Sequence, residues 1–246
     1  MFEYQAPPNL LADRVILVTG AGRGIGAAAA EAYAAHGAKV ILLGKTAANL
    51  QAVAQRIVGA GHPRPAVFEL DLEHAGTSDY EKLEVRIDDE FGRLDGLLHN
   101  ASLLGPRANL DEIPDADFIQ VMQVNVNATF MLTRAMLPLL HRSTDASVIF
   151  TSSSVGRKGR AQWGAYAVSK FATEGLMQTL ADELAGSSLI RANSLNPGGT
   201  RTDMRAQAYP GEDPQRNPRP EEIMPVYLYL MGPDSTGVNG QAFDAR

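Results

Sequence analysis

The feature that most constrains the fold is a run of glycines between a predicted strand and a predicted helix. Residues 14–19 (Arg-Val-Ile-Leu-Val-Thr) are mostly apolar and β-branched, which is typical of a strand buried on both faces of a parallel sheet. Four glycines follow within residues 20–26, and an alanine-rich run extends to His36. This order lets a pyrophosphate approach the free N–H groups of a helix N-terminus. The stretch therefore predicts a dinucleotide-binding site rather than a flexible turn.

The alternation of strand and helix continues along the whole chain. Further strands are predicted at residues 38–43, 66–70, 94–98, 147–151, 189–195 and 241–244, and further helices at 46–58, 77–91, 115–141, 166–185 and 221–231. This pattern predicts an α/β fold, a single doubly wound Rossmann domain spanning residues 1–246, with a seven-stranded, mostly parallel sheet and helices on both faces. Residues 203–220 contain four prolines and are long for a connection, which predicts a substrate lid or a disordered loop.

Composition excludes several classes of function. The formal charge of the 246 residues is −6, which disfavours a nucleic acid or an anionic membrane as partner. The chain has no cysteine, so disulfides, thiolate metal sites and a cysteine nucleophile are excluded. The five histidines are scattered in the sequence, and we predict no metal site. No apolar run approaches the ~20 residues that span a bilayer, and no signal peptide is visible, so we expect a cytoplasmic protein.

Tyr166 and Lys170 are the candidate chemical groups. Residues four apart on a helix lie on one face, which places a phenol beside an ammonium. A free phenol has a pKa of about 10, and a neighbouring cation should lower that pKa, so that Tyr166 could exchange a proton with a carbonyl or alcohol oxygen. The alternative is an amphipathic surface helix whose Tyr and Lys are unrelated.

The residues after the second and third strands bear on the choice of dinucleotide. An acidic residue after the second strand would bind the ribose 2′-hydroxyl of NAD, whereas a basic one accommodates the 2′-phosphate of NADP. This chain has Gly44 and Lys45 there, and Arg23 lies in the glycine loop, so we expect NADP(H) to be favoured over NAD. The alternative is that Lys45 is a solvated turn residue. Asp71 could accept from adenine or could simply cap a turn.

Five motifs, taken together, resemble the short-chain dehydrogenase/reductase family over essentially the whole chain. They are Thr19-Gly-x-x-x-Gly-x-Gly26, Asn100-Ala101, Asn125, a serine ahead of Tyr166-x-x-x-Lys170, and Pro197-Gly198. The C-terminal half also resembles the poorly characterised YciK-type bacterial oxidoreductases, which supply no substrate.

The resemblance implies hydride transfer between a nicotinamide and a carbonyl or secondary alcohol. It makes Tyr166 the acid/base and gives Lys170 two tasks, to lower the pKa of Tyr166 and to hold the nicotinamide ribose. Ser153 would bind the substrate oxygen, although only register excludes Ser152 and Ser154. Asn125, rather than Asn127, would hold a relay water. The implied cofactor-binding residues are Gly20, Gly22, Arg23, Gly24, Ile25, Gly26, Lys45, Asp71, Leu72, Asn100, Ala101, Lys170, Pro197, Gly198, Thr200 and Thr202.

The resemblance also implies a homodimer or homotetramer, built on the helices predicted at 115–141 and 166–185. One departure lies after the fourth strand, where His99-Asn-Ala-Ser102 replaces the usual Asn-Asn-Ala-Gly. We expect His99 to be a packing substitution, and Ser102 to narrow the space near the nicotinamide.

Two interpretations stay open for the basic loop, for Trp163 and for the function as a whole. The basic loop of Arg157, Lys158 and Arg160 could receive an anionic substrate group or be a solvated turn. Trp163 could line the substrate pocket or belong to a core or an interface. The competing function is a non-catalytic NADP-binding sensor or scaffold, because a fold does not fix a function. Such a protein would have no need of the Ser-Tyr-Lys-Asn set, which favours the enzyme.

Overall fold

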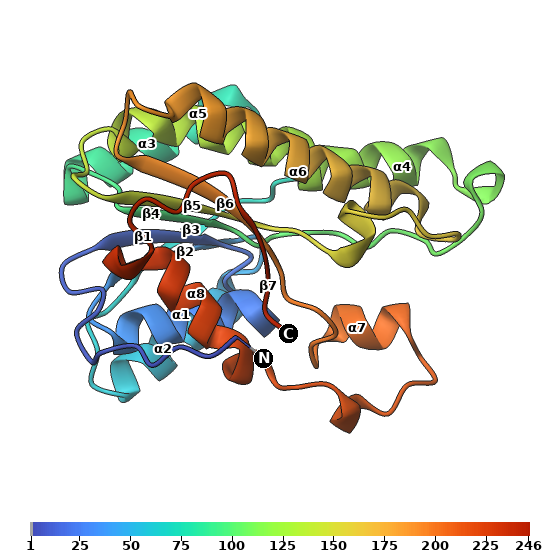
Figure 1. Cartoon of the computed structure of the whole chain (residues 1–246), viewed down its shortest axis with the longest axis horizontal. Helices are drawn as coiled ribbons and strands as arrows, with labels where there is room; N and C mark the ends of the chain where they lie inside the picture. Colours follow the sequence, from blue (N-terminus) through green and yellow to red (C-terminus); the bar gives the residue numbers. More distant parts are fainter. Residues whose placement is uncertain (1) are drawn as a thin grey trace.

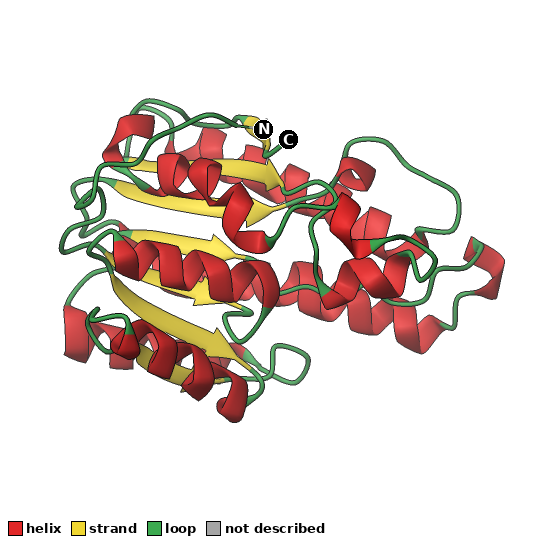
Figure 2. Ribbon diagram, turned by 90° about the horizontal axis from the view of Figure 1, so that it is seen from below, coloured by secondary structure: helices red, strands yellow, loops and turns green. Residues whose placement is uncertain are grey.

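The computed structural model describes residues 2–246 and contains one seven-stranded sheet in the order β3-β2-β1-β4-β5-β6-β7. Each of its six strand pairings is parallel, so the sheet is more regular than the mostly parallel sheet that we predicted. Figure 2 shows all the arrows pointing toward the same end of the molecule. The strands are β1 (Val15–Thr19), β2 (Lys39–Gly44), β3 (Ala66–Glu69), β4 (Gly96–His99), β5 (Ala146–Thr151), β6 (Ile190–Asn196) and β7 (Ala242–Asp244).

Helices cover both faces of the sheet (Figure 1). On one face lie α1 (Gly24–Ala35), α2 (Ala47–Gly59) and α8 (Met224–Met231), and on the other lie α3 (Thr77–Phe91), α4 (Asp115–Met122), α5 (Ala128–Leu140) and α6 (Gly164–Leu184). Successive side chains of a strand point to opposite faces. Accordingly, Ile16 and Val18 join the core beneath α1 and α8, whereas Val15 and Leu17 join the core beneath α3, α5 and α6. Burial on both faces explains why β1 is apolar throughout.

The chain changes direction across the sheet at β1. From β1 it proceeds outward to β2 and β3, and then returns to place β4 on the other side of β1. At such a switch point the connections that leave the two neighbouring strands run to opposite faces, which opens a crevice at the carboxyl edge of the sheet. The glycine loop after β1 and residues 100–102 after β4 therefore meet at this edge.

The helix predicted at residues 115–141 is interrupted. Between α4 and α5, the segment Gln123–Asn127 forms a π-helical turn, and Asn125 is buried within it. Such turns are rare in proteins, but those that occur often lie at functional sites. The prediction of one regular helix was therefore wrong in its middle. A π-helical turn holds one residue more than an α-helical turn, and the spacing of apolar residues does not reveal this.

Residues 203–220 are ordered rather than structureless. They begin with α7 (Asp203–Ala208) and contain a short 3₁₀ turn at Pro214–Arg216. Arg205 forms a two-point ion pair with Glu212, both contacts at 2.6 Å, and Asn217 donates to the same carboxylate at 2.8 Å. Figure 1 shows α7 projecting on the same side of the molecule as the start of α4. The segment thus has regular structure and contacts of its own, and a lid role stays a prediction.

Charged residues tie the opposite, amino edge of the sheet together. Arg14 donates to the Asp145 carboxylate at 2.6 Å and to the carbonyl of Asp95 at 3.0 Å. Arg191 pairs with the other oxygen of Asp145 and donates to Ser235 Oγ at 3.0 Å. These side chains link β1, β5 and β6 with the loop that precedes β4. Among residues 2–246, no helix combines the length and the apolar character needed to cross a membrane.

Candidate active site

The glycine loop leaves no room for side chains where it turns under the carboxyl edge. Gly20 and Gly24 have φ angles of +64° and +56°, which only glycine adopts without strain. A Cβ on Gly26 would lie 2.3 Å from the carbonyl oxygen of Gly20 and 2.6 Å from Nδ2 of Asn100. The loop therefore presents bare backbone at the start of α1, as a pyrophosphate requires.

Thr19 fastens this loop to the end of β4. Its Oγ1 accepts from the backbone N–H groups of Asn100 at 2.9 Å and Ala101 at 3.0 Å, and donates to the carbonyl of Leu98 at 3.2 Å. The side chain of Asn100 donates back to the carbonyl of Thr19 at 3.2 Å. Asn100 and Ala101, both predicted to contact the cofactor, thus lie against the glycines.

The loop after β6 closes the other side of the crevice. Gly198 has a φ of +69°, and its N–H donates to Asn196 Oδ1 at 3.0 Å. Thr200 is buried, and Thr202 caps α7 by accepting from Arg205 N at 3.2 Å. A Cβ on Gly24 would lie 3.5 Å from the methyl group of Thr202, so this loop approaches the glycine loop directly.

The two predicted cations lie at the surface beside the crevice. Arg23 pairs with Asp203, the first residue of α7, at 3.0 Å, with both side chains largely exposed. Lys45 is exposed at the end of β2. Both side chains are accessible to an anionic group. Because a surface ion pair is weak, Arg23 can leave Asp203 to bind such a group.

Asp71 has the turn role that the sequence left open. Its Oδ1 accepts from the N–H of Glu73 at 3.1 Å, and its Oδ2 lies 3.3 Å from His74 Nδ1. Asp71, Glu73 and His74 could place three ligand atoms around a metal ion, so one histidine does stand beside carboxylates, contrary to our expectation of scattered histidines. Glu73 also accepts from Gln120 at 2.7 Å, and exposed acidic groups of this kind are common without a metal.

The structure brings Tyr166, Lys170 and Ser153 together at the ends of β5 and α6. Lys170 is buried, and its Nζ lies 5.4 Å from the centre of the Tyr166 ring and donates to the carbonyl of Thr151 at 2.8 Å. The hydroxyl of Ser153 faces the phenol of Tyr166. Its two neighbours do not: Ser152 donates to Glu174, and Ser154 is exposed. The geometry thus singles out Ser153 among the three serines.

The pKa of Tyr166 is raised in this chain, whereas we expected its neighbour Lys170 to lower it. Burial raises the pKa of Tyr166 to about 12, and the nearby hydroxyls of Ser153 and Ser102 only partly oppose this rise. Burial also lowers the pKa of Lys170 to about 8, while Glu174 acts in the opposite direction. Spacing on a helix revealed that the two groups are neighbours, but not that both are buried, and burial is the largest cause of both pKa shifts.

The side chain of Asn125 already makes three hydrogen bonds within the protein. Its Oδ1 accepts from the N–H of Leu103 at 2.8 Å, and its Nδ2 donates to the carbonyl of Leu103 at 2.9 Å and to Ser169 Oγ at 3.0 Å. A relay water at this side chain would therefore have to use the remaining lone pair of Oδ1. Asn127 is exposed and binds only Gln123, at 3.0 Å.

The two residues that differ from the usual pattern after β4, His99 and Ser102, have distinct surroundings. The ring of His99 stacks on Phe150 with 5.0 Å between centroids, and its Nε2 lies 2.8 Å from Thr133 Oγ1. Burial lowers the pKa of His99 to about 3, so it is a neutral packing residue. Ser102 Oγ, by contrast, is buried near Tyr166 and finds no hydrogen-bond partner among residues 2–246. A buried polar group of this kind indicates a place where a ligand can supply the partner.

Aromatic and apolar side chains cover Tyr166 on the outer side. Trp163 is buried, and its ring centre lies 5.8 Å from that of Tyr166 and 5.9 Å from that of Tyr209, which follows α7. The guanidinium of Arg107 lies over the Trp163 ring at 4.8 Å and donates to the carbonyl of Ala208. Trp163 thus lies beside the candidate site and contacts the segment predicted to be a lid.

The basic loop is mostly occupied by partners within the chain. Arg157 donates to Glu174 at 3.2 Å and to Asp244 at 3.0 Å, and Arg160 donates to the hydroxyl of Tyr209 at 3.0 Å. Lys158 is exposed, as is Arg160, and neither forms an ion pair within residues 2–246. The loop is therefore chiefly structural.

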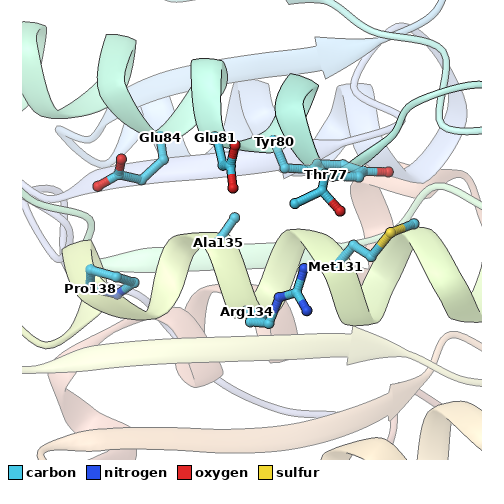
Figure 3. Close-up of a pocket in the computed structure, with 8 residues that line it drawn as sticks. All are labelled: Thr77, Tyr80, Glu81, Glu84, Met131, Arg134, Ala135 and Pro138. Atoms are coloured by element: carbon cyan, nitrogen blue, oxygen red, sulfur yellow. The ribbon is translucent and has the colours of Figure 1, made fainter.

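Two surface hollows lie away from this site. One, of about 290 Å³, separates α3 from α5, where Glu81 and Glu84 lie across from Arg134 (Figure 3). The other, of about 420 Å³, is at the amino edge around Arg14 and Asp145. Neither contains a residue of the predicted site.

Comparison with known proteins agrees with the geometry. The family model for short chain dehydrogenases matches residues 14–213. The Escherichia coli K12 protein named uncharacterized oxidoreductase YciK is 54% identical over 243 residues, which are 99% of this chain and 96% of that protein. A solved short chain dehydrogenase from Pseudomonas syringae is 70% identical, with a TM-score of 0.99 and 100% of both chains covered. A short chain dehydrogenase from Shigella flexneri 2a, complexed with NADP, is 54% identical, with a TM-score of 0.95 and coverage of 97% of this chain and 99% of that one.

Proposed function

Because this chain belongs to the short-chain dehydrogenase family, we propose that it is an NADP(H)-dependent oxidoreductase that transfers hydride between the nicotinamide and a carbonyl or secondary alcohol. The observation that carries the proposal is the meeting of Tyr166, Lys170 and Ser153 at the carboxyl edge, beside a glycine loop that admits no side chain. Catalytic groups and a nucleotide site belong together at such a switch point.

The residues of the crevice fit a dinucleotide. The bare backbone at Gly20 and Gly26 would hold the pyrophosphate, and Asn100, Thr200 and Thr202 line the same crevice on either side. The exposed cations Arg23 and Lys45 would bind a 2′-phosphate, and the Shigella flexneri relative was solved with NADP. We propose that NADP(H) is preferred over NAD(H).

Isothermal titration tests this preference. We expect the Kd for NADP to be at least about tenfold lower than for NAD, because a phosphate paired with cations contributes on the order of 1–3 kcal/mol. Lys45→Ala should weaken NADP binding and leave NAD binding unchanged. Equal affinities in the unaltered protein would remove the argument.

The protein's own groups would supply the proton and orient the substrate. The bound cofactor supplies or accepts the hydride, which is chemistry that the side chains cannot perform. With a pKa of about 12, Tyr166 keeps its proton at neutral pH, so in reduction it is the proton donor to the substrate oxygen. Ser153 donates a second hydrogen bond to that oxygen, and Lys170 holds the ribose. A preorganised donor of this type contributes roughly 3 kcal/mol in the transition state.

A screen of ketones, aldehydes and secondary alcohols, followed by NADPH absorbance, tests the function. Tyr166→Phe should lower kcat by about 100-fold or more, while the Kd for NADPH stays nearly unchanged. The matched control is Tyr209→Phe, which removes a nearby hydroxyl that binds Arg160. Tight NADPH binding with no turnover across the panel would instead favour the alternative, a non-catalytic NADP-binding sensor or scaffold.

We also propose that a second copy of the chain covers α5 and α6, giving a homodimer or a homotetramer. Phe130 on α5 and Val168 and Phe171 on α6 are large apolar side chains exposed by 43–48% in the single chain. Sedimentation should show an oligomer that Phe171→Glu dissociates. Val85→Glu, at an exposed apolar position on α3, is the control that should leave the oligomer intact.

A further inference from the structure

Glu174 lies buried on α6, one turn after Lys170 and two turns after Tyr166. Its carboxylate accepts from Ser152 Oγ at 2.5 Å, from Ser194 Oγ at 2.6 Å and from Arg157 Nε at 3.2 Å. A buried carboxylate is costly unless it is hydrogen-bonded and paired. Three donors from β6, the end of β5 and the turn after β5 meet this requirement, so the site is built for a negative charge.

The same contacts hold the segment that carries Ser153. Lys170 Nζ binds the carbonyl of Thr151, and Glu174 binds the hydroxyl of the next residue, Ser152. Two successive turns of α6 thus form hydrogen bonds with two successive residues at the end of β5. Ser153 comes directly after them, which fixes its position relative to Tyr166 on the same helix.

Glu174 also contributes a negative charge to the surroundings of Lys170. A lone buried ammonium loses its proton easily because it has left water. Burial lowers the pKa of Lys170, and Glu174 opposes that effect. Three charged or titratable groups surround the pair: Tyr166 on α6, Arg157 after β5 and Asp244 on β7. Asp244 forms an ion pair with Arg157 at 3.0 Å. The nearby residues of β6 and of the π-helical turn, Ser194 and Asn125, are uncharged.

We propose that Glu174 is a positioning residue for the reaction: it locks the Ser153 end of β5 against α6 and provides the negative charge that balances Lys170. This inference rests on the proposed function for its catalytic meaning. Its electrostatic part can be measured without any substrate.

The test is NMR titration of lysine labelled with ¹³C at Cε. The chain has only five lysines, and the Lys170 signal is identified by its loss in Lys170→Met. Glu174→Gln keeps the shape of the side chain and removes its charge, so the Lys170 midpoint should fall by about 1 pH unit. Glu183→Gln, at an exposed position on the same helix, should leave the midpoint unchanged. An unchanged midpoint in folded Glu174→Gln would overturn the proposal.

A second variant protects the test if Glu174→Gln does not fold. Arg157→Gln, at a partly exposed position, removes the cation that competes for Glu174 and should raise the Lys170 midpoint. A fall, or no change, in that midpoint would also count against the proposal.

A measurement of activity distinguishes a failure of the proposed role of Glu174 from a failure of the proposed function. If the carbonyl screen yields turnover, the alkaline limb of kcat against pH should move to lower pH in Glu174→Gln by the same amount as the Lys170 midpoint, and Glu174→Asp should restore it. A midpoint that shifts in the titration without moving this limb would mean that Glu174 does not act on the reaction. If the screen yields no turnover at all, the proposed function fails, while the titration still decides the charge balance.

Discussion

Replacing Asn125 by alanine tests whether the π-helical turn exists to hold the loop after β4. The Asn125 amide satisfies both backbone groups of Leu103, at 2.8 and 2.9 Å, and it donates to Ser169 at 3.0 Å. Ser169 would keep a partner after the change, because its hydroxyl donates to the carbonyl of Tyr166 at 2.7 Å. The change therefore leaves the backbone N–H and C=O of Leu103 without their hydrogen-bond partner.

The magnitude follows from two stranded backbone groups. Each partly buried N–H or C=O left without a partner costs roughly 1–1.5 kcal/mol, so Asn125→Ala should destabilise the chain by about 2–3 kcal/mol. For a chain of this size each kcal/mol corresponds to roughly 2–4 °C, which predicts a fall in Tm of about 4–12 °C.

Differential scanning calorimetry at one fixed protein concentration measures this fall, since association would otherwise shift the Tm. Asn127→Ala is the matched control: it lies two residues along the same turn, is exposed and binds only Gln123. We expect it to change stability by less than about 0.5 kcal/mol. Equal shifts for the two variants would refute the assignment of Asn125 to the loop.

Three further changes probe the site. Gly26→Ala should abolish NADP binding or folding, whereas Gly59→Ala, with nothing within 4 Å of the added methyl, should leave Tm within about 2 °C; calorimetry and titration compare them. Because His99 has a pKa of about 3 in the folded chain and about 6.5 when unfolded, protons bind the unfolded chain preferentially below pH 6.5. Urea unfolding should therefore show stability falling, between pH 6 and 4, by about 1.4 kcal/mol per pH unit more steeply than in His99→Asn. Ser102→Ala should lower kcat/KM by about tenfold and raise the alkaline pKa of the pH profile, whereas an unchanged profile would show that its hydroxyl does not act on Tyr166.

The layout of the chain could be predicted from its sequence because local patterns determine it. The apolar run of β1 and the glycines after it predicted a buried strand and a bare turn, and both are present. The segment of Gln123–Asn127 escaped prediction because a π-helical turn changes the hydrogen-bond pattern without changing the composition.

The chemistry of the site was predicted less completely, because depth of burial is not visible in a sequence. Helical spacing placed Lys170 beside Tyr166, but the rise in the pKa of Tyr166 comes from groups that exclude water. Glu174 was missed altogether, since its partners come from β5 and β6. A glutamate one turn after Lys170, on the same helix face, is a signal that could have directed attention to it.

The uniform direction of the strands divides the molecule into two rims with different tolerance for change. At the rim where strands begin, Arg14, Asp145 and Arg191 bind one another and leave little freedom for substitution. At the rim where strands end, the recognition of substrate that we propose would depend on loops and on the short α7. If residues 203–220 form the proposed lid, they can be exchanged to seek new substrates without changing the ion pairs at the opposite rim.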